Sequence, residues 1–256
     1  MEKEQKWPDT LWIVRHGQSA GNVARDEAEA AGKPMFEIAT RDADVPLSML
    51  GEHQATALGR WFAKLSPEEK PEVVLTSPYV RARRTAELAI EAAGLELKDV
   101  TFIVDERLRE KEFGILDRLT KVGVKEKYPE QSEFYHKLGK FYFRPPGGES
   151  WCDIILRLRS VIDTLTRDYR RERVLIVSHQ VVVNCFRYLI ERMTEQEILA
   201  ADRAEEIANC SVTAYGFNQT LGRRGKLALE LFNFVAPLEE AGETITSKPD
   251  VPVAPK

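Results

Sequence analysis

The fold is decided by the stretch Leu11-Trp-Ile-Val-Arg-His-Gly-Gln-Ser-Ala-Gly-Asn22. Its first four residues form a short apolar run bounded by charge or turn residues, which is typical of a strand buried on both faces of a parallel sheet. A second run, Val174–Val177, has the same character and leads into His179. In open α/β sheets, ligands bind in the crevice beyond the carboxyl ends of the strands. We therefore predict that His16 and His179 point into one crevice.

The rest of the chain alternates between strand and helix patterns. Further strands are predicted over residues 73–75 and 100–104, with a late antiparallel hairpin over residues 212–217 and 227–235. Helical spacing of apolar residues predicts helices over residues 50–65 and 80–93, and a long helix from Ser150. Ser77 and Pro78 are expected to begin the second of these. This order predicts a three-layer α/β/α sandwich with a mostly parallel central sheet.

The chain of 256 residues is expected to form a single domain over residues 1–236. Residues 105–149 are predicted to form a cap-like excursion from the sheet. Residues 24–44, rich in Ala and Glu, are either a lid over the cleft or a tolerated insertion. The composition of residues 237–256 predicts a disordered tail.

Charge and composition restrict the class of protein. The net charge is -4, which argues against a broad surface for nucleic acid. The sequence contains no apolar run long enough for a membrane span, and its first ten residues are charged where a signal peptide would be apolar. The three cysteines are odd in number and far apart, so no disulfide framework is expected. We expect a cytoplasmic protein with no nucleic-acid or membrane partner, and its oligomeric state stays open.

The residue types at the predicted crevice suit phosphate. Arg15 precedes His16, and Arg81 reaches the same sheet edge from the first turn of a helix. Guanidinium groups bind phosphate oxygens through paired hydrogen bonds and keep their charge at neutral pH. A neutral histidine beside them can attack phosphorus and form a covalent phosphohistidine.

A metal site made of His16, His179 and Glu110 is the chemical alternative. Two nearby guanidinium groups would repel a divalent cation in a cleft of low dielectric constant. We therefore favour phosphate, with no metal and no cofactor. For either histidine alone, a structural role at a strand end would be the better interpretation, but two at equivalent ends favour a site.

Six blocks of residues resemble, in order, the histidine phosphatase superfamily, which includes the cofactor-dependent phosphoglycerate mutases. They are residues 11–22, Pro46-Leu47-Ser48-x-x-Gly51-x-x-Gln54-Ala55, Thr76-Ser77-Pro78-x-x-Arg81-Ala82-x-x-Thr85-Ala86, Leu108-Arg109-Glu110, Pro146-Gly147-Gly148-Glu149-Ser150 and Val177-Ser178-His179. The resemblance covers residues 11–190 and implies a phosphoglycerate-mutase-like sandwich. It is carried by the order of the blocks rather than by any single one.

The resemblance also implies roles for individual residues. His16 would be the phosphorylated nucleophile, and Glu110 would give a proton to the leaving oxygen and then take one from water. The phosphate pocket would be lined by Arg15, Arg81 and His179, with a neutral contact from Asn22.

Two departures from the family pattern concern the substrate. Gln180 follows the second histidine where Gly is frequent, so we expect its side chain to contact substrate. Residues 114–118 replace a Gly-x-Trp-Glu-Gly block that often follows the acid. The segment after Glu110 also lacks the paired arginines that bind the substrate carboxylate in the mutase branch.

We therefore predict a metal-independent phosphomonoester hydrolase that acts through phosphohistidine on a small phosphorylated metabolite or other phosphomonoester. A phosphoglycerate mutase is the first alternative. An inactive phosphate-binding scaffold is the second.

Overall fold

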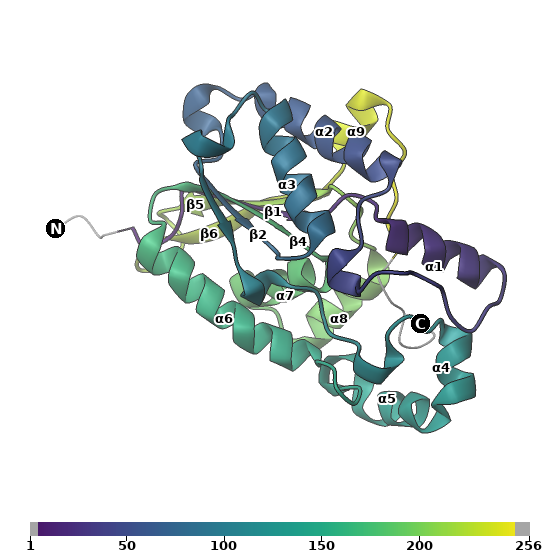
Figure 1. The fold of residues 1–256 in the computed structure, drawn as a ribbon. Helices are drawn as coiled ribbons and strands as arrows, with labels where there is room; N and C mark the ends of the chain where they lie inside the picture. Colours follow the sequence, from purple (N-terminus) through teal and green to yellow (C-terminus); the bar gives the residue numbers. More distant parts are fainter. Residues whose placement is uncertain (1–4, 249–256) are drawn as a thin grey trace.

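The computed structural model describes residues 5–248, and its centre is a six-stranded sheet in the order β3-β2-β4-β1-β5-β6 (Figure 1). The strands are β1 (Thr10–Arg15), β2 (Val73–Thr76), β3 (Thr101–Val104), β4 (Arg173–Ser178), β5 (Val212–Asn218) and β6 (Lys226–Phe234). The first four are parallel, whereas β5 and β6 form an antiparallel extension beside β1. The predicted mostly parallel sheet is therefore confirmed.

Helices cover both faces of the sheet. On one face lie α2 (Met49–Ala63), α3 (Val80–Ala92) and the short α9 (Ala236–Ala241), and on the other α6 (Trp151–Asp168), α7 (Gln180–Ile190) and α8 (Glu195–Ala204) (Figure 1). Leu11 and Ile13 of β1 pack with the α6 and α7 core, while Trp12 and Val14 pack with the α2 and α3 core. Because β1 is covered on both sides, its apolar residues run without alternation, and the α/β/α sandwich follows.

The cap-like excursion holds α4 (Lys121–Lys127) and α5 (Pro129–Tyr142), joined to the sheet by the short turns η4 (Glu106–Leu108) and η5 (Gly114–Leu116). It has a small apolar cluster of its own, made of Leu116, Leu119, Val124 and Phe143. Such a satellite cluster gives the excursion a fixed shape apart from the main core.

The segment expected to be a lid or an insertion divides into two parts. Its first residues belong to α1 (Ala20–Ala30), and the remainder runs past the excursion and includes the short turn η1 (Asp42–Asp44). Arg118 in the excursion holds this second part, because its Nη1 donates to the carbonyl of Ile38 at 2.9 Å and its Nη2 to that of Thr40 at 2.9 Å. Arg118 therefore joins the excursion to this segment.

The chain beyond Pro237 differs from the expected disorder as far as residue 248. Residues up to 241 form α9, and the backbone of Thr246 then accepts a hydrogen bond from the amide of Asn209 at 2.7 Å. Gln54 Nε2 also donates to the carbonyl of Thr244 at 2.8 Å. Buried polar groups of the domain need hydrogen-bond partners, and this segment supplies them. Residues 249–256 lie outside the described part of the chain.

No helix within residues 5–248 has both the length and the apolar character needed to cross a membrane.

Candidate active site

The two predicted histidines meet beyond the carboxyl ends of β1 and β4. These strands are parallel neighbours in which Arg15 pairs with Ser178, so the residues that follow lie side by side. His16 and His179 are both fully buried, and their ring centroids are 5.0 Å apart. The structure thus brings together two residues that are far apart in sequence.

The hydrogen bonds of His16 define its tautomer. Its Nδ1 lies 2.7 Å from the carbonyl oxygen of Gly17, which can only accept, so Nδ1 carries the proton. Its Nε2 accepts a hydrogen bond from Nε of Arg81 at 3.2 Å. Both contacts require a neutral ring with its lone pair on Nε2. A lone pair on an imidazole nitrogen is the group with which a histidine attacks phosphorus.

Arg81 forms an ion pair that the sequence did not predict. The Nη1 and Nη2 atoms of its buried guanidinium contact Asp42 Oδ1 at 3.1 Å and Oδ2 at 3.2 Å. Nη1 also donates to the backbone carbonyl of Asp42 at 2.6 Å. A carboxylate offers two oxygens with nearly the geometry of two phosphate oxygens. Asp42 therefore contacts the fork of Arg81 as a substrate phosphate would.

His179 is held by a residue that was assigned another role. The expected helix start at Ser77 and Pro78 is wrong, because α3 begins at Val80. The Ser77 hydroxyl instead lies 2.8 Å from His179 Nε2 and fixes the orientation of the ring. On the other side of the ring, Nδ1 lies 4.0 Å from Oε2 of Glu110.

Glu110 places a buried carboxylate beside the histidine pair. Its Oε1 accepts a hydrogen bond from the amide of Lys111 at 2.7 Å. The residues around Glu110 are mostly charged, and of these Glu110 and Lys111 have buried side chains, whereas Glu112 is exposed.

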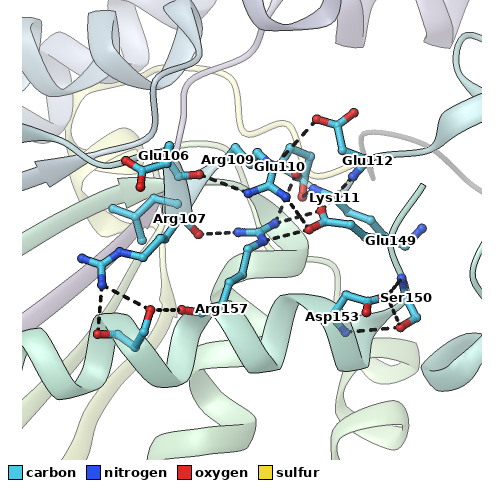
Figure 2. Close-up of polar contacts among 12 residues, drawn as sticks. Glu106, Arg107, Arg109, Glu110, Lys111, Glu112, Glu149, Ser150, Asp153 and Arg157 are labelled. Atoms are coloured by element: carbon cyan, nitrogen blue, oxygen red, sulfur yellow. Dashed lines mark hydrogen bonds and ion pairs between the residues drawn. The ribbon is translucent and has the colours of Figure 1, made fainter. Parts of the chain in front are cut away.

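A network of charged residues fixes the backbone at Glu110 (Figure 2). Arg157 Nη2 donates to the carbonyl of Glu110 at 3.3 Å, and Arg157 Nε lies 3.1 Å from Glu149 Oε1. The same carboxylate accepts from Arg109 Nη2 at 2.7 Å and from the amide of Glu112 at 3.1 Å. Glu149 and Arg157 thus act as positioning residues for Glu110.

Arg15 is buried at the end of β1, and its guanidinium bonds to backbone carbonyls. Its Nη1 donates to Ile207 at 2.7 Å and to Ser247 at 3.3 Å, and its Nη2 to Lys248 at 2.8 Å. It therefore anchors the segment that was expected to be disordered. Its contact with phosphate stays a prediction.

Asn22 and Gln180, the predicted substrate contacts, are both buried. Asn22 forms a capping box at the start of α1, where its Oδ1 accepts from the Ser19 amide at 3.0 Å. Gln180 is the first residue of α7, and within the described chain its Oε1 has no hydrogen-bond partner. Asn22 lines the site's cavity, whereas Gln180 does not.

That cavity has a volume of about 30 Å³ and lies next to Arg81 and Glu110. Such a volume admits roughly one or two water molecules. The opposite wall comes from residues 36–45 and from Phe113, Asp117 and Arg118. The shape of the cavity is therefore set in part by the two segments that Arg118 joins.

Two further contacts that hold the loop after β1 went unpredicted. The side-chain Nδ2 of Asn209 donates to the carbonyl of His16 at 2.8 Å, and the backbone amide of Gly17 donates to the Thr85 hydroxyl at 3.0 Å. Thr85 lies within one of the six sequence blocks, which was a usable signal, whereas Asn209 has no such signal. Within residues 5–248, no three His, Cys, Asp or Glu side chains are grouped as a metal ion would require.

Comparison with known proteins identifies the family. The family model of the histidine phosphatase superfamily, branch 1, matches residues 11–226. The chain belongs to this superfamily. Its members are phosphatases or mutases. The chain therefore belongs to a family of enzymes that transfer phosphoryl groups.

Relatives of both kinds resemble the chain. A 2,3-bisphosphoglycerate-dependent phosphoglycerate mutase of Rhizobium meliloti is 31% identical over 198 residues, which are 76% of this chain and 85% of the mutase. A probable phosphoglycerate mutase of Photorhabdus laumondii is 28% identical over 212 residues, 82% of this chain and 86% of that protein. The structure of mycobacterial glucosyl-3-phosphoglycerate phosphatase with inorganic phosphate has a TM-score of 0.65 at 23% identity, covering 90% of this chain and 99% of that one.

Proposed function

We propose that this protein is a metal-independent phosphomonoester hydrolase that works through phosphohistidine on Nε2 of His16. The observation that carries the proposal is the hydrogen bond from Arg81 Nε to that nitrogen at 3.2 Å, with Nδ1 bound to Gly17. It supports a neutral nucleophile directed at a phosphate-binding cation.

In the first step, His16 Nε2 attacks phosphorus while the bond from phosphorus to the leaving oxygen breaks. Arg81 and His179 stabilise charge on the non-bridging oxygens, and Glu110 gives its proton to the leaving alcohol. The products of this step are a free alcohol and a phosphoenzyme, with Glu110 as carboxylate.

In the second step, the Glu110 carboxylate takes a proton from water, and the oxygen attacks phosphorus. The bond from His16 to phosphorus breaks, and inorganic phosphate leaves. Glu110 is then protonated and His16 neutral, as at the start. No step needs a metal ion, because the charge on the transferred group is balanced by Arg81.

Rapid quench with ³²P-labelled substrate tests the proposal. We expect acid-labile, base-stable label on the wild-type protein and turnover that persists in a chelator. Turnover that is lost to the chelator and restored by zinc or magnesium would contradict it.

Phosphoglycerate mutase activity is the second candidate, favoured by the 31% identity to the Rhizobium meliloti enzyme. One assay separates the two activities by following phosphate release and the interconversion of 3- and 2-phosphoglycerate with a bisphosphate primer. Isomerisation that runs much faster than phosphate release would establish the mutase.

A further inference from the structure

The wall of the cavity that faces the leaving group is acidic. Asp42 and Asp117 line it together with Glu110, and its cationic residues in the described chain are Arg81 and Arg118. Glu110 holds its proton when the proposed reaction begins, so two carboxylates and two guanidinium groups lie in the wall of a space that a leaving group must enter.

Neither guanidinium is available to an anionic leaving group. Arg81 is the ligand for the transferred phosphate under the proposed function. The Nη1 and Nη2 atoms of Arg118 donate to the carbonyls of Ile38 and Thr40 and hold the wall in place. Lys111, a buried cation nearby, does not line the cavity, and its ammonium lies 4.4 Å from the ring centroid of Phe113, which does.

The Asp42 and Asp117 carboxylates lie close enough for the charge of Asp42 to affect the pKa of Asp117. Burial, and after it the negative charge of Asp42, raises the pKa of the Asp117 carboxyl above its ordinary value. Both side chains are about half exposed, and each lies beside a guanidinium, Asp42 at 3.1 Å from Arg81 and Asp117 at 3.7 Å from Arg118. An additional negative charge in this space would be repelled by both.

Phosphate binding changes the partner of Asp42. A phosphoryl group that occupies Nη1 and Nη2 of Arg81 must replace the Asp42 carboxylate, which now contacts the same atoms at 3.1 and 3.2 Å. The displaced carboxylate has lost its cation and needs a hydrogen-bond donor in exchange. A cavity of about 30 Å³ must also widen to admit more than water, and residues 36–45 are the wall that carries Asp42.

We propose that the leaving group is an uncharged or cationic alcohol whose hydroxyl or ammonium groups donate hydrogen bonds to Asp42 and Asp117, and that a carboxylated leaving group is rejected. The proposal rests on the proposed function, because it takes Arg81 as the phosphate ligand. It assigns Asp42 and Asp117 as specificity-determining residues.

The test compares ligands of nearly equal size that differ in the charge of the leaving group. Glycerol 3-phosphate and 3-phosphoglycerate differ in a hydroxymethyl group against a carboxylate, and phosphoethanolamine carries an ammonium. Calorimetry on the inactive His16→Ala protein measures binding of all three without turnover. We expect glycerol 3-phosphate and phosphoethanolamine to bind at least about tenfold more tightly than 3-phosphoglycerate, the factor that about 1.4 kcal/mol of repulsion produces.

Removing either carboxylate should reduce this preference. Asp42→Asn also frees Arg81 and strengthens binding of every phosphate ester, so the ratio of affinities is the readout rather than any single affinity. In the His16→Ala background, Asp42→Asn and Asp117→Asn should each lower the ratio at least threefold. The matched control Asp44→Asn should leave it unchanged, because Asp44 pairs with exposed Arg41 outside the cavity.

Equal or tighter binding of 3-phosphoglycerate, or a ratio that neither Asn variant changes, would overturn the proposal. The proposed function has a separate readout, which is phosphate release from a generic aryl phosphate by the wild-type protein. A protein that binds with the expected preference but releases no phosphate would refute the hydrolase assignment and leave the specificity assignment intact.

Discussion

Lys111 is a buried cation whose removal should stabilise the protein at neutral pH. Within the described residues its Nζ has no hydrogen-bond partner, and it contacts the face of Phe113. Burial lowers the pKa of its ammonium from the ordinary 10.5 to about 8, even though the nearby Glu110 and Glu149 carboxylates act in the opposite direction. We therefore expect Lys111→Met to raise the free energy of unfolding.

The size and pH dependence of the effect follow from the lowered pKa. Each pH unit by which a pKa is displaced corresponds to about 1.4 kcal/mol, so the charged Lys111 costs the folded state about 3 kcal/mol below pH 8. Between pH 8 and 10.5 the unfolded chain binds more protons than the folded one, so the stability of the wild type rises with pH. We expect Lys111→Met to recover about 1–3 kcal/mol of this cost at pH 7.

Urea unfolding of both proteins at pH 7, 8, 9 and 10 measures this difference. The stability difference between Lys111→Met and the wild type should shrink steadily as pH rises. The control Lys137→Met, which removes an exposed lysine of α5, should differ from the wild type by at most about 0.5 kcal/mol at every pH. A difference that stays constant with pH, or a destabilised Lys111→Met, would refute the reasoning.

The remaining predictions concern the site. His16→Ala should abolish turnover and trapped label while its circular dichroism stays that of the wild type; equal label on the variant would exclude His16 as nucleophile. Glu110→Gln should slow alkyl phosphates roughly a hundred- to ten-thousandfold and aryl phosphates much less, because an aryl leaving oxygen hardly needs a proton; steady-state rates that fall equally for both would exclude Glu110 as the acid. Asp42→Asn should lower the inhibition constants of phosphate and vanadate about three- to tenfold, because the Arg81 fork loses its competing carboxylate; unchanged constants would mean that Asp42 does not compete.

Much of the fold was predictable because its signals are local. The unbroken apolar run of β1 reports burial on both faces, and the 3.6-residue spacing after Ser150 reports the buried face of α6. The positions of His16 and His179 followed from a general rule about strand ends rather than from any contact. His16, Arg81 and Glu110 were named as candidates because their residue types lie in recognisable blocks.

Only the tertiary structure decided which partners these residues have. Ser77 orients His179, Asp42 binds Arg81, and Arg15 bonds to carbonyls of residues 207, 247 and 248. None of these pairs shares a helix turn or a strand register, so no local periodicity encodes it. Such contacts arise because a buried charge or hydroxyl must find a partner among whatever the folded chain brings within about 3 Å. The sequence determined the sheet and the chemical groups at its edge, and the packing of distant segments over that edge determined the walls of the cavity.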